Sequence, residues 1–508
     1  MSRDRRRVRH PAPRGRSGAT GTGRRVVVAG GGIAGLAAAT ALAERGVAVE
    51  LFERESYLGG RVGGWTTTLP DGTRTGMSRG FHAFFRQYYN LRALLRRADP
   101  DLGVLTPVPD YPLVDAHGRT DSFEGLPRTP PWNALAFALR SPTFTARDLL
   151  RVDRRTALAL LNVRVPGTYE ELDHIDAREF LDRVRFPPAA RHLAFDVFSR
   201  SFFADPRQLS AAELAVMFHL YFLGSAEGLL FDVANEPFHR LWQPLAEQLG
   251  RHGGTVHTGT AVEAIEPGTR FRVHTGAHVT EADAVVLALD VRGLREVVAA
   301  SPGLGSRDWR DRIAGLATAP PFLVRRLWLD RPVEPARPAF LATGGLPPLD
   351  NISVLDRFDS DAASWARRSG GSVVELHAYA ATGSAEETGR ALLTRLHELY
   401  PETRTATTVA DRSEWRADCP LFPPGGFPRR PGIETPVEGL VLAGDAIRVD
   451  LPVALMERAA TTGLAAANRL LAAWGVTGHD LLSVPVRGRI PPLRLLAAHA
   501  TPRAPQSH

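Results

Sequence analysis

The stretch Arg24-Arg-Val-Val-Val-Ala-Gly-Gly-Gly-Ile-Ala-Gly35 decides the fold of this 508-residue chain. Its β-branched run, residues 25–29, is continuous, which is typical of a strand that is covered on both faces. Gly30, Gly32 and Gly35 follow with the G-x-G-x-x-G spacing. These glycines allow a tight turn, a close approach of the backbone to a pyrophosphate, and close packing of helix on strand. We therefore predict a strand, a glycine turn and a helix that begins at residue 33.

A second predicted strand, residues 47–53, ends in the acidic residue Glu53. An acid about 20 residues after the glycine turn is where dinucleotide-binding domains bond the hydroxyls of a ribose. Strand, turn, helix, strand and acid in this order predict an α/β fold built on a Rossmann-type dinucleotide-binding domain. The alternative is a strand-to-helix turn of the same shape that binds no ligand.

Gly59, Gly60 and Arg61, which begin six residues after Glu53, distinguish between the dinucleotides. The two glycines leave bare N–H groups beside an anion, and a guanidinium can bond it in fork geometry. NAD would not need this second clamp, so the sequence favours FAD. The alternative for Arg61 is an ordinary surface charge.

The composition limits what else the protein can be. A hydrophobic content of 44% and a charged content of 23% are ordinary for a soluble globular protein. The single cysteine, Cys419, excludes a disulfide framework and a cysteine-bound iron–sulfur cluster, and it indicates a reducing compartment, the cytoplasm. No run reaches the roughly 18 apolar residues of a membrane-spanning helix. We expect neither a metal site nor a nucleic-acid partner.

Residues 1–23 are rich in arginine, proline, glycine and serine, and we predict that they form a disordered basic tail. Arg5-Arg6-Arg7 would suit a twin-arginine export signal, but the apolar residues behind it already form the nucleotide strand and helix. The formal net charge of the chain is +7. Attraction to an anionic membrane surface is therefore the alternative to a tail that is simply solvated.

We predict a FAD-binding domain assembled from separate segments, because prolines cluster at residues 107–112 and 127–131 and interrupt the nucleotide-binding pattern. The intervening segments form an inserted α+β substrate domain. The predicted order is 24–100 (FAD domain), 101–237 (substrate domain, helix-rich), 238–300 (FAD domain), 301–430 (substrate domain), 431–475 (FAD domain) and 476–508 (C-terminal tail).

Two helix starts of the capping-box type are expected in the inserted domain, at Asp176 with Glu179 and at Ser210 with Glu213. The second helix, residues 211–223, is apolar around its whole circumference. Such a helix is normally buried in the protein. The alternatives are that it lines a hydrocarbon tunnel or dips into a bilayer.

A second cofactor signal is the strand-like Gly439-Leu-Val-Leu-Ala-Gly444-Asp445, followed by a small-residue helix that we expect to begin near Pro452. With Gly59-Gly60-Arg61 it resembles the glutathione-reductase-like flavoproteins of the amine-oxidase and carotenoid-desaturase type. In that family the Gly-Gly-Arg wraps the FAD pyrophosphate and the aspartate binds ribityl hydroxyls. The helix N-terminus faces the flavin, where it stabilises negative charge. The usual glycine of that helix start is missing here.

The motifs and the resemblance together give the expected FAD contacts. Val262 matches a family position whose backbone contacts the adenine. The residues expected to bind FAD are Gly30, Gly32, Ile33, Ala34, Gly35, Glu53, Arg54, Gly59, Gly60, Arg61, Val262, Gly444, Asp445 and Val453.

The chain contains no lysine, which bears on the reaction. Amine oxidases of this fold typically keep a lysine hydrogen-bonded through water to flavin N5. The run Gly80-Phe-His-Ala-Phe-Phe-Arg-Gln-Tyr-Tyr-Asn-Leu-Arg92, together with Phe202-Phe-Ala-Asp205, is similar to the bacterial carotenoid β-ring aromatases. These are also called φ-ring or isorenieratene synthases, or β-carotene desaturase/methyltransferases. The resemblance implies a hydrophobic polyene substrate.

In the reaction of that family each β-ring of a carotene loses hydrogens and one geminal methyl migrates, which gives a trimethylphenyl end group. Oxidised flavin can take hydride, and the resulting cation is suited to a methyl shift and proton loss. We expect His82 and Arg79 beside the flavin. His82 is the candidate base, because its unperturbed pKa suits proton transfer, and Arg79 binds or orients. The alternative is a structural hydrogen bond from His82.

Aromatic side chains near this run form either core or an apolar substrate wall, and Trp65 and Phe81 are candidates for stabilising a cationic ring. The alternative functions are a phytoene or ζ-carotene desaturase or isomerase, a flavin amine oxidase, and a non-catalytic flavin-binding membrane adaptor. We expect a cytoplasmic protein that associates peripherally with a membrane surface. The aromatic residues in question are Phe81, Phe84, Phe85, Tyr88 and Tyr89.

Overall fold

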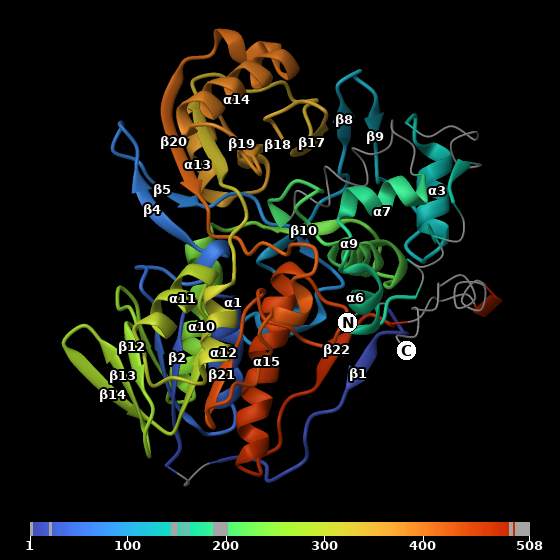
Figure 1. The fold of residues 1–508 in the computed structure, drawn as a ribbon. Helices are drawn as coiled ribbons and strands as arrows, with labels where there is room; N and C mark the ends of the chain where they lie inside the picture. Colours follow the sequence, from blue (N-terminus) through green and yellow to red (C-terminus); the bar gives the residue numbers. More distant parts are fainter. Residues whose placement is uncertain are drawn as a thin grey trace.

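The structure is a computed structural model. It describes residues 4–19, 23–143, 162–185 and 202–486, together with 151–153, 156–157, 160 and 491–492. Two bodies of secondary structure dominate it (Figure 1). The lower body in this view surrounds a parallel sheet, and the upper body surrounds a larger mixed sheet.

The lower body is built on a five-stranded parallel sheet with the order β11-β3-β2-β15-β21. Its central strand is buried on both faces, because Val26 and Val28 join one apolar core while Val27 and Ala29 join another. This Rossmann-type order confirms the predicted α/β fold class. The strands are β2 (Arg25–Ala29), β3 (Ala48–Phe52), β11 (Thr255–His257), β15 (Ala284–Leu287) and β21 (Leu440–Leu442).

Helices cover both faces of this sheet. Small residues let α1 lie against α15, since a Cβ on Gly463 would come within 2.2 Å of the Ala34 carbonyl oxygen. Helices α11 and α12 pack on the opposite face, and a small antiparallel sheet, yellow-green in Figure 1, extends beside them. The bounds are α1 (Ile33–Ala43), α10 (Phe238–Arg251), α11 (Val291–Ala299), α12 (Arg307–Ala314), α15 (Leu455–Ala473), β12 (Ala264–Glu266), β13 (Phe271–Thr275) and β14 (His278–Ala282).

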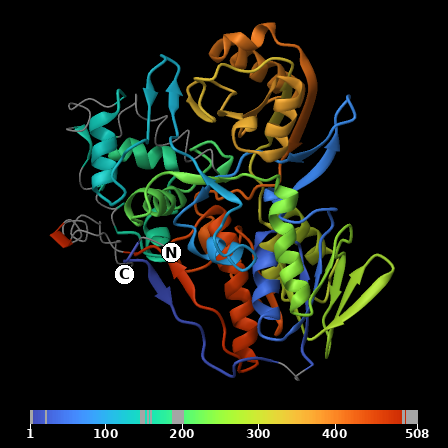
Figure 2. The same ribbon diagram turned by 180° about the vertical axis from the view of Figure 1, so that it is seen from behind.

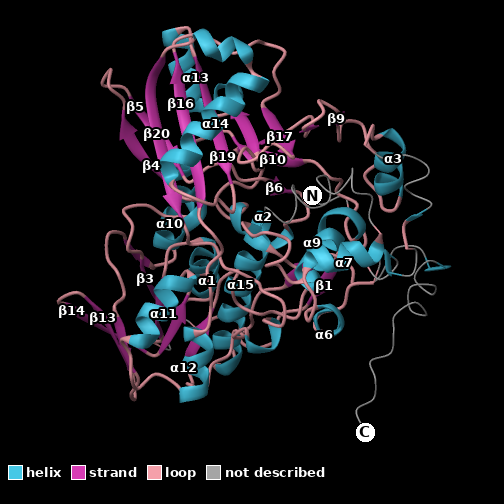
Figure 3. Cartoon of the chain, turned by 45° about the horizontal axis from the view of Figure 1, so that its top comes forward, coloured by secondary structure: helices cyan, strands magenta, loops and turns pink. Residues whose placement is uncertain are grey.

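The upper body is a seven-stranded sheet with the order β20-β16-β19-β18-β17-β8-β9, and α13 and α14 lie across its strands (Figure 3). Strand β8 pairs with β17, so both segments predicted for the substrate domain contribute to one sheet. The bounds are β8 (Leu113–Asp115), β9 (Thr120–Asp121), β16 (Phe322–Leu329), β17 (Phe340–Gly344), β18 (Asn351–Val354), β19 (Ser372–Ala378), β20 (Thr408–Arg416), α13 (Ser360–Ser369) and α14 (Ala385–Leu399).

The apolar helix predicted over residues 211–223 is α9 (Ala211–Phe218), which runs on as a π-helical turn, His219–Leu223. All but Phe218 of these residues are buried in the protein, as the first interpretation of the pattern predicted. The bounds of the further elements are α2 (Tyr89–Leu95), α3 (Trp132–Arg140), α6 (Gly167–Leu172), α7 (Ala177–Val184), β4 (Gly64–Thr68), β5 (Arg74–Ser78), β6 (Phe84–Phe85), β7 (Leu105–Pro107) and β10 (Phe231–Ala234).

The two predicted helix caps turned out differently. The Asp176 carboxylate accepts from the backbone N–H of Glu179 at 2.7 Å, as expected. Ser210 accepts from the second residue of α9 instead of the third, and Glu213 does not complete a capping box. Its carboxylate instead bonds Arg430 at 2.6 Å and Arg458 at 2.7 Å, because two buried guanidinium groups need a counter-ion.

Described segments near both ends of the chain contribute a strand, so the prediction of disorder is corrected for residues 4–19. Strand β1 (Val8–His10) pairs antiparallel with β22 (Leu481–Ser483), and the two lie side by side in Figures 1 and 2. The positive charge of the N-terminal arginines is compatible with this strand pairing, and Arg9 forms an ion pair with Asp480 at 2.5 Å. Within the part of the chain that the structure describes, no helix has the length and apolar character needed to cross a membrane.

Candidate active site

A cavity of about 580 Å³ is lined by residues of both bodies. One end is formed by the glycine turn after β2, the end of β3 and the loop after β21. The other end is formed mainly by aromatic side chains. Arg79 and His82 lie on its wall, together with most of the residues expected to bind FAD. These are Gly30, Gly32, Ile33, Ala34, Glu53, Arg54, Gly59, Gly60, Arg61, Val262, Gly444 and Asp445.

The glycine turn forms a bare cradle. Gly30 has a φ of +104°, and a Cβ there would lie 2.4 Å from the Ala288 carbonyl oxygen. Gly32 caps α1 without a side chain, and a Cβ on it would meet only the Gly60 Cα, at 3.9 Å. The first N–H groups of α1 therefore face open space. Gly35 is off the cavity wall and instead serves helix packing, since its Cβ would lie 1.8 Å from the Gly30 carbonyl oxygen.

Val453 does not line the cavity, which corrects its assignment as a cofactor contact. It is buried, and its carbonyl oxygen accepts a hydrogen bond from Nε of Arg458 at 3.0 Å. Helix α15 begins later than expected, after Ala454, which has no capping side chain. Leu455 and Met456 occupy the wall in its place. The uncapped N-terminus of α15 thus adjoins the cavity with free N–H groups.

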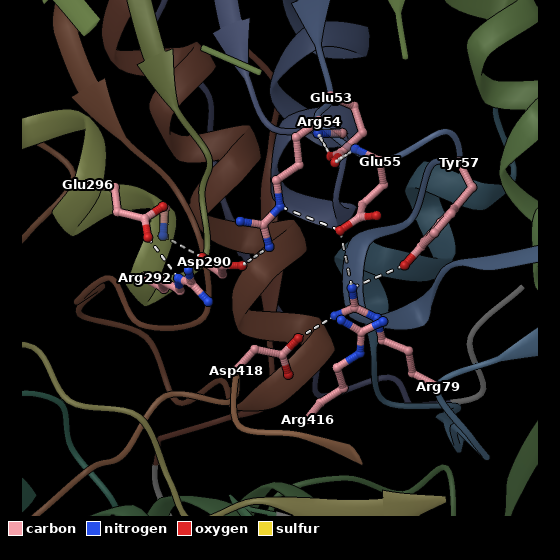
Figure 4. Close-up of polar contacts among 12 residues, drawn as sticks. Glu53, Arg54, Glu55, Tyr57, Arg79, Asp290, Arg292, Glu296, Arg416 and Asp418 are labelled. Atoms are coloured by element: carbon pink, nitrogen blue, oxygen red, sulfur yellow. Dashed lines mark hydrogen bonds and ion pairs between the residues drawn. The ribbon is translucent and has the colours of Figure 1, made fainter. Parts of the chain in front are cut away.

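Glu53 is fixed by the backbone at the end of β3. Its carboxylate accepts from the N–H groups of Gly31 at 2.6 Å and Glu55 at 2.8 Å. Burial raises the pKa of Glu53, and these two bonds only partly offset it. Arg54 donates to Asp290 at 2.9 Å across the cradle (Figure 4). The acceptor that the sequence assigned to a ribose is therefore preoriented beside the glycine turn.

Arg61 and Asp445, 384 residues apart in the sequence, meet on the cavity wall with an Nη2–Oδ1 distance of 2.5 Å. The two motifs that predicted a cofactor are thus parts of one site. Bare amides and a guanidinium suit a pyrophosphate, whereas the carboxylates of Glu53 and Asp445 suit hydroxyls. This donor set, next to a cradle that any side chain would fill, fits FAD.

The apolar end of the cavity is a group of packed rings. Phe81 lies 4.4 Å from Phe340 between ring centroids, and Phe85 lies 4.2 Å from Tyr221. Trp65 does not line the cavity, so it is not placed to stabilise a ring cation there. Of the aromatic residues left open between core and wall, Phe81, Phe85 and Tyr88 line the cavity, whereas Phe84 and Tyr89 belong to the core.

His82 does not keep the ordinary pKa on which its assignment as the base depended. Burial lowers the pKa of His82 to about 4. Its Nδ1 lies 2.9 Å from the Gly80 carbonyl oxygen, so Nδ1 is the donor and Nε2 carries the lone pair. His82 is therefore a neutral side chain on the cavity wall with one structural hydrogen bond.

Arg79 is buried among its own partners (Figure 4). It pairs with Asp418, donates to the Tyr57 hydroxyl at 3.0 Å and lies 3.7 Å from the Glu55 carboxylate. These carboxylates hold the pKa of Arg79 above its usual value in spite of burial. Arg79 is thus fixed in position, which agrees with an orienting role and not with a reacting one.

Residues 33–471 match the flavin containing amine oxidoreductases. The chain belongs to that family. The match also confirms the prediction of a flavin-dependent oxidoreductase with FAD as cofactor.

Within this flavoprotein family, relatives of known function cover almost the whole chain. The chain is 60% identical to the carotenoid phi-ring synthase of Streptomyces griseus, over 98% of this chain and 97% of the relative. It is 27% identical to the carotenoid phi-ring synthase of Chlorobaculum tepidum, over 92% and 91%. A probable zeta-carotene desaturase of Synechococcus elongatus is 26% identical, over 89% and 99%. The suspected resemblance to φ-ring synthases is therefore confirmed.

Solved structures agree on the fold of this flavoprotein. Putrescine oxidase bound to putrescine superposes with a TM-score of 0.65 at 18% identity, covering 88% of this chain and 99% of that one. Cyclohexylamine oxidase from Brevibacterium oxydans gives 0.62 at 15% identity, covering 88% and 99%.

Sequence reasoning missed a polar group on the flavoprotein's cavity wall. Thr343, Asp350, Asn351 and Tyr379 line it, with His377 directly behind Tyr379. The signal was present in residues 372–378, where a glutamate and a histidine stand two positions apart in an otherwise apolar strand and so share one face. Among the described residues no group of three or more histidine, cysteine or acidic side chains could hold a metal ion.

Proposed function

We propose that this chain is a carotenoid φ-ring synthase, which converts β-ionone rings of β-carotene to aromatic rings by desaturation with a 1,2-methyl shift. The identity of 60% to the Streptomyces relative, over 98% of the chain, carries this proposal. The wall of packed aromatic rings supports it, because a hydrocarbon ring needs an apolar surface. The lysine-free sequence argues against amine oxidation.

We further propose that the cavity residues predicted from the sequence hold FAD. The N–H groups at the start of α1 and the guanidinium of Arg61 would bond the pyrophosphate. Glu53 would bond a ribose, and Asp445 the ribityl hydroxyls. When bound, FAD supplies an acceptor for hydride.

The remaining work belongs to the apolar end of the cavity, which is formed by residues 81–88 together with the substrate domain that we propose for residues 101–237 and 301–430. An aromatising ring gives up two hydride equivalents and two protons while one methyl moves to the neighbouring carbon. The chain must orient the ring, exclude water and stabilise positive charge. The faces of Phe81, Phe85 and Phe340 suit a cationic ring, because an aromatic face carries negative charge.

Expression in cells that make β-carotene, followed by pigment analysis, tests this function. Aromatic end groups are expected with the wild-type chain. Asp445→Ala should produce neither bound FAD nor aromatic pigment. Unchanged β-carotene beside well-expressed yellow wild-type protein would overturn the proposal. Conversion in phytoene-making cells instead would identify a desaturase.

We also propose that α3 attaches the protein to an anionic membrane surface, where a polyene substrate dissolves. Its side chains Trp132, Leu135 and Leu139 are 58%, 47% and 71% exposed, and their spacing places them on one face of the helix. Helix α3 itself lies at the edge of the molecule (Figure 1). Arg128 and Arg140 at its two ends are also exposed. An apolar face flanked by arginines suits insertion between anionic headgroups.

The opposite face of α3 connects this surface to the cavity. Phe137 stacks on Phe123 at 4.8 Å, and Phe123 stacks on Tyr111 at 5.4 Å. Tyr111 lies on the cavity wall. A membrane bound at α3 would therefore lie next to the apolar end of the cavity. This position supports a lipid surface as the partner of the exposed face of α3.

A further inference from the structure

A line of hydrogen-bonded polar side chains ends at the cavity wall on Tyr379. The Tyr379 hydroxyl lies 2.7 Å from Nδ1 of His377 and 3.0 Å from the amide nitrogen of Asn351. Nε2 of His377 lies 2.8 Å from the Glu375 carboxylate. That carboxylate also binds Arg326, at 2.6 and 2.8 Å.

The register of the upper sheet builds this line. Arg326 on β16 stands opposite Glu375 on β19, and Asn351 on β18 stands opposite His377 on β19. Side chains directly opposite each other on neighbouring strands are close enough to bond. The arrangement is therefore fixed by backbone pairing and does not depend on a loop.

These hydrogen-bonded polar side chains are buried, and they lead to a cavity that is lined with aromatic rings. The side chains of Glu375 and His377 are each 1% exposed. Placing such groups out of water is costly unless all of them are partnered. Arg326 and His377 hold the pKa of Glu375 at about 2 against the effect of burial, so the carboxylate is ionised.

The direction of each hydrogen bond follows from what each group can donate. The Asn351 amide has only hydrogens to offer at its nitrogen, so the Tyr379 oxygen accepts from it. Because the Glu375 carboxylate can only accept, Nε2–H of His377 donates to it, and Nδ1 accepts the Tyr379 proton. The backbone N–H of Phe81 also points at Nε2, at the longer distance of 3.4 Å. A phenol, an imidazole and a carboxylate thus stand in sequence, in the order needed to pass one proton inward.

We propose that Tyr379, His377 and Glu375 form a proton relay that removes the protons released when the substrate ring becomes aromatic. This inference rests on the proposed function and adds the base that it requires. Tyr379 is the catalytic residue, because it lines the cavity. His377 and Glu375 act through it as positioning residues.

In the proposed step the substrate is the ring cation after methyl migration. A C–H bond next to the cationic carbon breaks, its electron pair becomes the new ring double bond, and its proton bonds to the Tyr379 oxygen. At the same time the phenolic proton moves to Nδ1 of His377. The imidazolium is stabilised by the Glu375 carboxylate, as in a catalytic triad. Nothing is oxidised or reduced in this step, and the proton returns to solvent after product leaves.

Two other side chains on the wall are rivals for this role. His82 has its pKa lowered to about 4, which makes it a weaker proton acceptor at neutral pH. Asp350 lines the cavity and accepts from the backbone N–H of Tyr379 at 2.5 Å, so it lies beside the relay. Substitution separates these candidates.

The test uses the purified FAD-loaded full chain with β-carotene in mixed micelles and a quinone in excess, which reoxidises the flavin between hydride transfers. Tyr379→Phe removes one hydroxyl and keeps the ring, so we expect kcat to fall about 100-fold or more with an unchanged KM. His377→Gln should lower kcat in the same way without changing KM. FAD content should match the wild type, whereas the melting temperature should fall modestly in both variants because each removes a buried hydrogen-bond partner. Tyr400→Phe is the matched control, because this buried tyrosine belongs to the core under α14 and is expected to retain full activity.

The outcomes are distinct. A wild-type enzyme that aromatises β-carotene while Tyr379→Phe does so equally well would overturn the relay and leave the proposed function intact. Loss of kcat in Asp350→Asn with full activity in Tyr379→Phe would assign the base to Asp350 instead. If His377→Gln raised KM and left kcat constant, His377 would contribute to substrate binding and not to proton transfer. A wild type that leaves β-carotene unchanged would overturn the proposed function itself.

Discussion

Gly32→Ala should separate cofactor binding from folding. The backbone at Gly32 is extended, with φ −72° and ψ −178°, so alanine adopts it without strain. The added Cβ would meet no atom closer than the Gly60 Cα at 3.9 Å. Its methyl group would project into the cradle in front of the first N–H groups of α1. We therefore expect an apoprotein that folds normally and binds FAD weakly.

The size of the effect follows from the bonds that the methyl group would block. A hydrogen bond to a charged group contributes about 1.5–3 kcal/mol, so losing one to the pyrophosphate should raise the FAD Kd about 10- to 100-fold. Alanine is a poorer N-cap than glycine, which should cost the apoprotein no more than about 1 kcal/mol. Gly35→Ala is the contrasting variant, because its Cβ would lie 1.8 Å from the Gly30 carbonyl oxygen.

The assay is a titration of each apoprotein with FAD, followed by flavin fluorescence, together with a thermal melt of the same apoprotein. Gly32→Ala should melt close to the wild type and bind FAD weakly. Gly35→Ala should melt far lower, because two backbone segments must move apart. Wild-type FAD affinity in Gly32→Ala, or an equally low melting temperature in both variants, would refute the cradle as described.

Three further predictions concern stability and membrane binding. Glu213→Gln leaves two buried arginines without their carboxylate, so the free energy of unfolding should fall by about 3–5 kcal/mol; an unchanged midpoint in urea would contradict this. Because the pKa of His82 is lowered from 6.5 to about 4, the unfolded chain binds more protons between these values. Wild-type stability should thus be lost as the pH falls from 6.5 to 4, by at most about 3 kcal/mol since part of the ring faces the cavity. His82→Gln should flatten the curve in urea titrations at several pH values, and an equally steep curve would remove His82 as the cause. Leu135→Asp with Leu139→Asp should abolish co-flotation with vesicles of anionic phospholipid, whereas Val409→Asp, an exposed valine on β20, should not; flotation of the double variant would disprove docking through α3.

Elements with a local signal were predicted well from the sequence. The strand Arg25–Ala29 and the helix start at Asp176 lie where they were expected, since a continuous apolar run and an aspartate cap act within a few residues. The pairing of residues 8–10 with residues 481–483 was missed. An arginine-rich tail shows no local preference for order, and its stability comes from a partner strand at the other end of the chain.

In the candidate site, too, features set by local sequence were predicted, and features set by distant residues were not. A pyrophosphate is bound mainly by backbone N–H groups, and only glycines leave them bare, so the cradle can be recognised from residues such as Gly30 and Gly32 alone. The exception at this end, Val453, shows the limit: the start of α15 depends on the buried Arg458, which bonds the Val453 carbonyl oxygen. Arg458 belongs to α15 itself, but its guanidinium is held by the distant Glu213, a contact that local propensity does not reveal.

The proton chemistry depends on side chains whose properties arise only in the folded protein. His82 was chosen for the pKa of a free imidazole, and burial removed that property. Glu375 and Tyr379 are ordinary residues in sequence, four positions apart on one strand and its end. They become a relay because neighbouring strands place Arg326 opposite Glu375 and Asn351 opposite His377. A ligand held by backbone N–H groups, such as the pyrophosphate, can thus be predicted from a sequence motif. The proposed proton acceptor cannot, because an apolar substrate imposes no pattern of polar residues on the sequence. It is found only from the pairing of strands in the folded sheet.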